Sequence, residues 1–397
     1  MKTIQNIKPI TEKMKSISLL IILTIAAITA NSQDSYMNKD SLIAKTYFKN
    51  TKFHEPVLIN KDEISKTSKP KNVILFIGDG MSFAQVSAAL TANKGKLNLN
   101  YFEVMGMSKT SSASDFVTDS GAGGTAISTG KKTYNKAIAV GIDSLPMKTI
   151  LEICEENKFS TGLVATAVVT HATPASFIAH NKYRYNYEEI ALDFLKTNVE
   201  VVIGGGRNHF TKRKDGRNLL SELIKQGYDV SSSIDEKIKA KKFICLTDSL
   251  HPPIATERGD YLPNATKKAI GFLAEKKAPF FLMVEGSQID WGGHDLDLPY
   301  VVNEMLDFDR AIGVALEFAA ENGETLIIVT ADHECGGLSI LNGNEQTGEV
   351  WGAFSSDDHS PIMVPVFAIG PGSEKFRGIY ENTKIFYCIL DALNIKP

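Results

Sequence analysis

The chain has 397 residues, 43% of them hydrophobic and 22% charged, which is the composition of a globular protein with a large core. Its formal net charge of -3 provides no basic patch for nucleic acid, so we predict no nucleic-acid partner. The four cysteines are widely spaced and include no CxxC pair. This spacing excludes a disulfide-dense scaffold and leaves open whether any two are bridged.

The amino-terminal region has the pattern of a signal peptide. Four lysines precede an apolar run at residues 17–30, and small residues lie at the two positions that a signal peptidase reads. The run is shorter than the roughly 20 apolar residues of a transmembrane helix. A buried or amphipathic helix is the alternative, but it does not explain the order of basic, apolar and small residues. We predict a signal peptide over residues 1–32, a periplasmic or extracellular location, and no stable membrane anchor after cleavage.

Apolar runs that alternate with helical patterns follow a polar segment at residues 33–70, which is predicted to be an N-terminal arm. The apolar runs are 73–77, 162–167, 199–203, 280–284, 326–329 and 364–369, and helical periodicity is strongest at 147–154 and 302–319. This alternation predicts an α/β fold, a three-layer sandwich with a central, mostly parallel sheet covered by helices on both faces. No repeat or linker marks a boundary, so residues 71–397 are predicted to form a single domain.

Acidic and imidazole side chains cluster at the ends of these predicted strands, where α/β folds place their ligand sites. The set comprises Asp79, Glu285, Asp290, His294, Asp332, His333 and His359. Any one of them could be a helix cap or a turn residue. Four separate strand ends that carry such residues favour a site instead. Imidazole and carboxylate without thiolate suit zinc in a catalytic role, with a harder, oxygen-ligated cation beside it.

The local spacing within this set suggests how pairs share an ion. Two glycines lie between Asp290 and His294, and they are predicted to form a tight turn that brings both side chains to one metal. Asp332 and His333 are adjacent, so both can bind one ion only in a loop past the strand end.

A second centre lies at residues 118–130, where glycine and alanine follow Ser120 and allow a ligand to approach the backbone. If a helix begins at Ser120, its first N–H groups and its dipole favour an anion there. A serine hydroxyl in that position beside metal ions is a candidate nucleophile. The alternative is that Ser120 is only a helix N-cap.

Five motifs in order resemble those of alkaline phosphatases, and the resemblance extends over residues 72–370. They are NVILFIGDGM at 72–81, TDSGA at 118–122, HATPA at 171–175, VEGSQID at 284–290 and TADH at 330–333.

The resemblance implies two Zn²⁺ ions, one Mg²⁺ ion and a phosphoserine intermediate on Ser120. The implied ligands of one zinc are Asp79, Ser120, Asp332 and His333. Those of the other zinc are Asp290, His294 and His359. Those of the magnesium are Asp79, Thr173 and Glu285, with Asp79 bridging. Arg184 resembles the arginine that holds the phosphate with two donors, and Lys182 fits that role less well.

The chain departs from the family pattern at two positions beside the third metal and the phosphate. His171 favours zinc over magnesium at the third site, and Trp291 removes a possible cationic contact to phosphate. Only 25 residues separate His333 from His359, which indicates a compact member without a large insertion.

The resemblance further implies small phosphate monoesters as substrates and a homodimer. A phosphodiesterase, sulfatase or phosphomutase on the same scaffold is the enzymatic alternative. A sulfatase needs Pro and Arg after its nucleophile, and Ser120 lacks both. A secreted metal- or phosphate-binding protein without catalysis is the non-enzymatic alternative.

Overall fold

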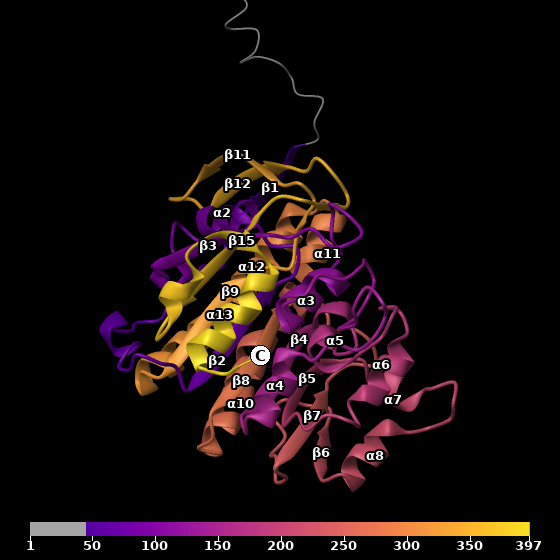
Figure 1. Cartoon of the computed structure of the whole chain (residues 1–397). Helices are drawn as coiled ribbons and strands as arrows, with labels where there is room; N and C mark the ends of the chain where they lie inside the picture. Colours follow the sequence, from indigo (N-terminus) through magenta and orange to yellow (C-terminus); the bar gives the residue numbers. More distant parts are fainter. Residues whose placement is uncertain (1–44, 397) are drawn as a thin grey trace, which may run out of the picture. The chain divides into compact units, whose positions relative to one another are not determined.

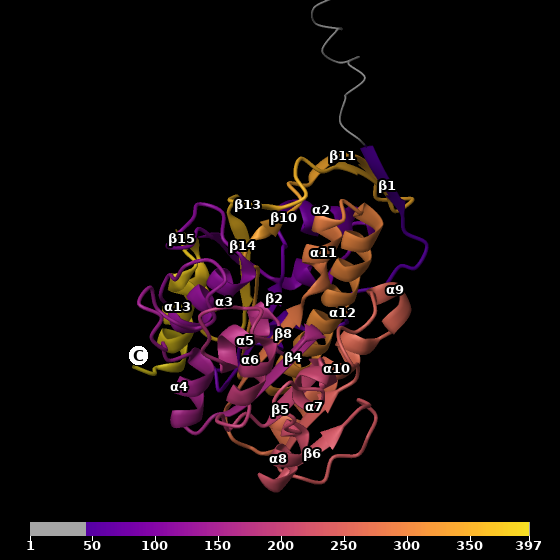
Figure 2. The ribbon, with the colours of Figure 1, turned by 90° about the vertical axis from the view of Figure 1, so that its right-hand side faces the viewer.

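The computed structural model describes residues 45–396 (Figure 1). The predicted signal peptide and the first part of the predicted arm lie outside these residues. The rest of the arm is not wholly irregular, because β1 (Lys45–Lys49) pairs antiparallel with β12 (Glu349–Ala353). With β11 (Ser339–Asn344) they form a three-stranded sheet, which Figures 1 and 2 show at one end of the fold.

A ten-stranded sheet forms the centre of the fold, in the order β15-β3-β14-β9-β2-β8-β4-β5-β7-β6. Its strands are β2 (Asn72–Gly78), β3 (Val104–Lys109), β4 (Ser160–Val168), β5 (Val201–Gly205), β6 (Tyr228–Ser231), β7 (Lys242–Leu246), β8 (Phe280–Gly286), β9 (Thr325–Thr330), β14 (Val364–Ile369) and β15 (Gly378–Glu381). Only β14 runs against its neighbours, antiparallel to both β3 and β9. The six predicted apolar runs all overlap strands of this sheet, which is mostly parallel as predicted.

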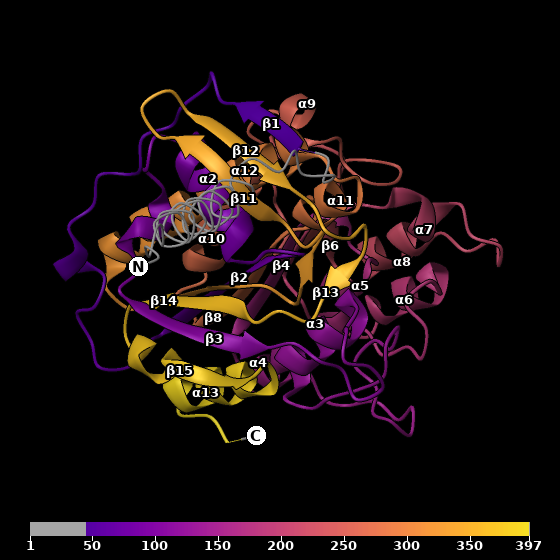
Figure 3. The same ribbon diagram turned by 90° about the horizontal axis from the view of Figure 1, so that it is seen from above.

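Helices cover both faces of the sheet (Figure 3). Alternating residues of β2 belong to two separate cores, with Ile74 and Phe76 in one and Val73, Leu75 and Ile77 in the other. This alternation follows from the pleat of a strand, and it explains why β2 reads as a continuous apolar run. The three-layer α/β sandwich predicted from the sequence is therefore confirmed.

One face packs against α2 (Phe83–Ala92), α10 (Tyr261–Glu275) and α12 (Leu298–Asn322). The other packs against α3 (Ser120–Thr129), α4 (Ile150–Glu156), α5 (Ala172–Ile178), α6 (Tyr187–Asp193), α8 (Leu219–Lys225) and α13 (Thr383–Leu393). The remaining elements are α7 (Arg207–Thr211), α9 (Ala255–Arg258), α11 (Gln288–His294), β10 (Glu334–Cys335), β13 (His359–Ser360), η1 (Lys61–Glu63), η2 (Asn98–Tyr101) and η3 (Ser373–Phe376). No helix within residues 45–396 is both long and apolar enough to span a membrane.

Candidate active site

The candidate site lies where four adjacent strands of the sheet, β9, β2, β8 and β4, reach their carboxyl ends. Asp79 follows β2, Glu285 is near the end of β8, and Asp332 lies just past β9. His171 and Thr173 follow β4. The predicted residues therefore share one edge of the sheet because their strands are parallel neighbours.

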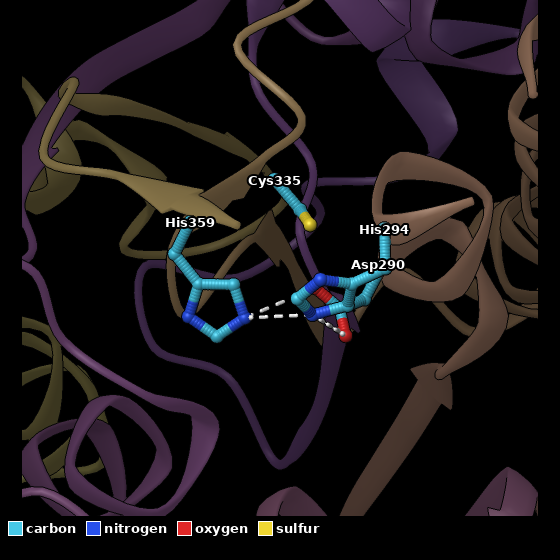
Figure 4. A group of neighbouring side chains, drawn as sticks. All are labelled: Asp290, His294, Cys335 and His359. Atoms are coloured by element: carbon cyan, nitrogen blue, oxygen red, sulfur yellow. Dashed lines mark hydrogen bonds and ion pairs between the residues drawn. The ribbon is translucent and has the colours of Figure 1, made fainter. Parts of the chain in front are cut away.

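Asp290, His294 and His359, named here the outer cluster, converge from two parts of the chain (Figure 4). The Nε2 atoms of the two histidines are 3.2 Å apart, and each lies 3.4 Å from an oxygen of Asp290. Nitrogen and oxygen ligands at about 2.0–2.1 Å from a tetrahedral zinc lie about 3.3–3.4 Å from one another. The outer cluster therefore has the spacing of a zinc site.

The two histidines of the outer cluster present Nε2 to the shared space because their other ring nitrogens are engaged. His294 Nδ1 donates to the Asp357 carbonyl oxygen at 2.7 Å, and His359 Nδ1 donates to that of Thr118 at 2.9 Å. A proton held on Nδ1 leaves the Nε2 lone pair free for a metal.

Asp290 and His294 do not form the predicted tight turn. They lie on helix α11, and because residues at i and i+4 share one side of a helix, both side chains point to the same side. The glycines between them instead allow close packing, because a Cβ on Gly292 would meet the Val301 backbone nitrogen at 2.7 Å.

Asp79, Asp332, His333 and Ser120, named here the inner cluster, are almost fully buried. His333 Nε2 lies 3.4 Å from an oxygen of Asp79 and 3.4 Å from an oxygen of Asp332. The Ser120 hydroxyl is 3.2 Å from the same nitrogen. These separations again match the edges of a tetrahedral zinc site, and Asp332 and His333 lie in the loop past β9 as predicted.

Asp79, His171 and Glu285, named here the third cluster, have donor atoms within 4.8 Å of one another. Thr173 Oγ1 donates to Asp79 at 3.4 Å, and Ser287 Oγ donates to Glu285 at 2.5 Å. Asp79 belongs to both the inner and the third clusters, in line with a bridging role. Burial, and then repulsion from the Arg184 guanidinium, lowers the pKa of His171 to about 3, so its imidazole is neutral and able to act as a ligand.

The buried carboxylates at this site require positive charge. Each has an oxygen that is buried without a hydrogen-bond partner, namely Asp79 Oδ1, Glu285 Oε1, Asp290 Oδ1 and Asp332 Oδ2. Burial raises the pKa of Glu285 to about 8, and burial together with the charge of Asp290 raises the pKa of Asp332 to about 6. Carboxylates this deeply buried are normally paired or coordinate metals. The donor chemistry and the unpartnered oxygens fit divalent cations.

Ser120 is the first residue of α3, and it is not the N-cap. Asp119 is the N-cap, and its side chain accepts from the Ala122 N–H at 3.0 Å. A Cβ on Gly123 would meet the Asp332 carbonyl oxygen at 2.9 Å, so glycine lets α3 approach the inner cluster. The Ser120 hydroxyl therefore lies at the positive end of a ten-residue helix.

Arg184 is buried beside this helix start and offers one free edge. Its Nη1 donates to Asp119 at 2.8 Å, while Nε has no partner and Nη2 lies 3.5 Å from His171 Nε2. Nε and Nη2 form one edge of the planar guanidinium, so a two-donor fork remains for an anion. Burial opposes ionisation of Asp119, but the Arg184 charge offsets it and holds the pKa of that carboxyl below its usual value.

A cavity of about 610 Å³ opens in front of Ser120, Arg184 and the outer cluster. Trp291 lines it, with its ring edge-on to His171 at 6.1 Å between centroids. Lys136 and Tyr185 also line it, and no motif had pointed to either residue. Lys182 is exposed and does not line the cavity.

Cys335 lies beside the outer cluster, and the sequence analysis did not single it out. Its sulfur belongs to the same group of potential ligand atoms as Asp290, His294 and His359, whereas the sequence analysis considered imidazole and carboxylate donors alone. The Asp-His-Glu-Cys order around it carries no recognisable metal spacing, and only the pairing of β10 with β13 brings it there. All four cysteines are buried and unbridged.

A buried hydroxyl at a helix N-terminus, between a guanidinium fork and three clusters of metal-binding side chains, is suited to metal-assisted transfer of a phosphoryl group. The sequence profile of the family described as alkaline phosphatase matches residues 70–355. The chain belongs to the alkaline phosphatase family and is by class a phosphoric monoester hydrolase.

Curated relatives and solved structures agree with this family. The chain is 41% identical to alkaline phosphatase 3 of Bacillus subtilis over 71% of its own length and 63% of that protein. It is 30% identical to the alkaline phosphatase of Escherichia coli, over 84% of this chain and 88% of that one. The alkaline phosphatase of the Antarctic bacterium TAB5 superposes with a TM-score of 0.79 and 41% identity, covering 84% of this chain and all of that one.

Proposed function

We propose that this chain hydrolyses phosphate monoesters through a phosphoserine formed on Ser120, with two zinc ions and a third metal ion. The observation that carries the proposal is the Ser120 hydroxyl, 3.2 Å from His333 Nε2, at the start of α3 and at the wall of the cavity that Arg184 also lines.

Each group of residues has a distinct role in this proposal. The outer and inner clusters would hold the two zinc ions, and the third cluster with Thr173 would hold the third ion. Bound divalent ions supply Lewis-acid charge at the reacting oxygens. Arg184 and the first N–H groups of α3 bind the non-bridging oxygens of the phosphate and orient phosphorus toward Ser120.

The reaction would proceed in two displacements. Ser120 Oγ forms a bond to phosphorus as the bond to the alcohol oxygen breaks, and the alcohol leaves with a proton. Water then attacks the phosphoserine, so that inorganic phosphate leaves and Ser120 is restored. Arg184 keeps its contact to phosphate throughout, so we expect release of the product to limit turnover.

The direct experiment measures metal content by elemental analysis and compares hydrolysis of an aryl phosphate monoester with that of the matching diester. We expect the elemental analysis to detect zinc and the kinetics to show a clear preference for the monoester. Preference for the diester would contradict the proposed reaction, and absence of hydrolysis despite bound metal would favour a binding protein.

Substitution of Arg184 separates monoesterase from diesterase. A monoester dianion offers two free oxygens to the fork, whereas one oxygen of a diester is alkylated. Arg184→Ala is therefore expected to lower kcat/KM for the monoester by at least about 1.5–3 kcal/mol, roughly tenfold to more than a hundredfold, and to weaken inhibition by phosphate. Steady-state kinetics on both substrates provides the measurement.

Arg184→Lys should recover part of this loss, because an ammonium restores charge without the planar fork. Lys182→Ala is the matched control. It should leave kcat/KM for both substrates unchanged, since this lysine is exposed and outside the cavity. If Arg184→Ala lowers kcat/KM equally for the monoester and the diester, Arg184 stabilises the fold through its ion pair with Asp119 and does not bind the substrate.

The third ion is proposed to depend on His171. A solved structure of a histidine-to-aspartate variant of the TAB5 enzyme has magnesium bound in a site called M3. His171→Asp replaces a nitrogen donor with a carboxylate oxygen, and hard oxygen ligands favour magnesium. We expect the variant to retain more magnesium relative to zinc than the parent after dialysis against both metals. An unchanged magnesium-to-zinc ratio would contradict a role for His171 at that ion.

Export and assembly complete the proposal. The predicted signal peptide supports a periplasmic or extracellular enzyme, and the family resemblance supports a homodimer. The division into signal peptide, arm and a single catalytic domain also stays a prediction from the sequence.

A further inference from the structure

Cys335 differs from the other cysteines in its surroundings. Cys154, Cys245 and Cys388 pack within the two hydrophobic cores of the fold. Cys335 is completely buried but belongs to neither core. A buried thiol normally behaves as a small apolar side chain. Cys335 instead lies among polar ligands, so core packing does not account for it.

The short pairing of β10 with β13 places Cys335 beside the outer cluster. Cys335 lies directly opposite His359 in this antiparallel pair. Directly opposite residues of two strands point to the same face, with their Cβ atoms about 4.5–5.5 Å apart. The backbone therefore directs the thiol and the imidazole to the same side, and Figure 4 shows the sulfur pointing into the space beside Asp290 and His294.

Two glycines hold Cys335 in this position. A Cβ on Gly293 would lie 2.9 Å from Cys335 Sγ, and a Cβ on Gly80 would lie 2.9 Å from Cys335 Cβ and 2.7 Å from Asp290 Cα. The turn after β2, at Gly80, and helix α11, at Gly293, therefore approach Cys335 from two sides. A side chain at either glycine would prevent this approach. The sulfur has little room to turn away from the cluster.

The donor atoms form a compact group. Cys335 Sγ, one oxygen of Asp290 and one ring nitrogen each of His294 and His359 all lie within 4.8 Å of one another. Asp290 Oδ1 is buried without a hydrogen-bond partner, so it is a second, independent donor that a cation at this place would satisfy. Zinc accepts sulfur, nitrogen and oxygen ligands of these kinds, so the four donors are chemically able to share one ion.

We infer that Cys335 is a sulfur ligand of the metal ion that Asp290, His294 and His359 bind. The ion would then have four protein donors, and a substrate oxygen would enter as a fifth ligand, which catalytic zinc accommodates. The thiol loses its proton when it coordinates. Thiolate and Asp290 together neutralise a divalent ion, and the soft sulfur favours a soft ion such as cadmium over ions that prefer oxygen. The inference rests on the metal centre of the proposed function and does not depend on turnover.

Cobalt substitution of the full chain tests the inference by spectroscopy. The apoprotein, prepared by chelation, is titrated with Co²⁺ alone while its near-ultraviolet absorption is recorded. Sulfur bound to cobalt produces a charge-transfer band that nitrogen and oxygen ligands do not. We expect this band in the parent and no band in Cys335→Ser. The control variant Cys388→Ser should retain the band. Cys388 is a matched control because its thiol donates to the Lys375 carbonyl oxygen, a bond that a hydroxyl can replace.

Competition between cadmium and zinc supplies a second measurement. Loss of the sulfur ligand should lower the cadmium-to-zinc affinity ratio by at least about tenfold in Cys335→Ser, since even residues that only orient a ligand change metal affinity by about 10–100-fold. Cys388→Ser should leave the ratio unchanged.

The parent protein alone can overturn the inference, even if Cys335→Ser does not fold. Stoichiometric cobalt binding without a sulfur band would show that Cys335 is not a ligand while leaving the metal centre intact. A chain that binds no cobalt or zinc at all would contradict both this inference and the proposed function.

Discussion

Ser120→Ala is expected to lower kcat/KM for phosphate monoesters by about a thousandfold or more, because it removes the attacking oxygen, and loss of a nucleophile is among the most costly single changes to an enzyme. The variant should keep its metals and its fold. Asp119, rather than Ser120, caps α3, and the carboxylates and imidazoles of the three clusters are unchanged. Slow hydrolysis by water should remain.

Two measurements check this expectation. Acid quench of the parent with labelled substrate should trap phosphate on Ser120, whereas the alanine variant should trap none. Ser87→Ala is the control, because Ser87 lies on the exposed face of α2 and should not affect the rate. If label never becomes covalent in the parent, water attacks the substrate directly and the serine pathway is wrong.

Loss of an outer-cluster ligand should have a comparable effect. Asp290 lies 3.4 Å from both His294 Nε2 and His359 Nε2, so Asp290→Ala removes a carboxylate that faces both histidines. We expect the variant to bind about one zinc fewer per chain. Its activity should fall by more than about 100-fold, because removal of a residue that only orients a ligand already costs about 10–100-fold. Chelation of the parent should abolish activity, and zinc with magnesium should restore it better than either ion alone.

Asp295→Asn is the matched control for this experiment, since Asp295 is an exposed carboxylate just past α11. Its zinc content and activity should equal those of the parent, as measured by elemental analysis and steady-state kinetics. Full zinc content in both Asp290→Ala and His294→Ala would remove the basis for assigning an ion to the outer cluster.

Local sequence patterns were sufficient to predict the layers of the fold and the place of the site. Buried parallel strands contact helices on both faces, so they appear as continuous apolar runs such as that of β2. Asp79 and Asp332 could be predicted as neighbours because each directly follows such a strand, and the ends of adjacent parallel strands share one edge. The position of Ser120 in the candidate site could be predicted because a helix was expected to begin at this residue.

Pairings between distant segments could not be predicted, because they depend on packing rather than on periodicity. The opposite direction of β14 is set by its neighbours β3 and β9, and no apolar pattern records strand direction. The helical form of α11 was missed because two glycines suggest a turn, whereas close packing against α12 requires small residues there.

The arrangement of side chains around the candidate ions was likewise decided by the tertiary structure. Asp119 and Arg184 are 65 residues apart in the chain, yet their ion pair orients the guanidinium fork. Cys335 reaches the outer cluster only through its pairing with His359, because two short strands meet there without any motif of their own. The ends of the strands can be predicted from the sequence. The contacts between side chains beyond those ends depend on how the loops pack in the tertiary structure.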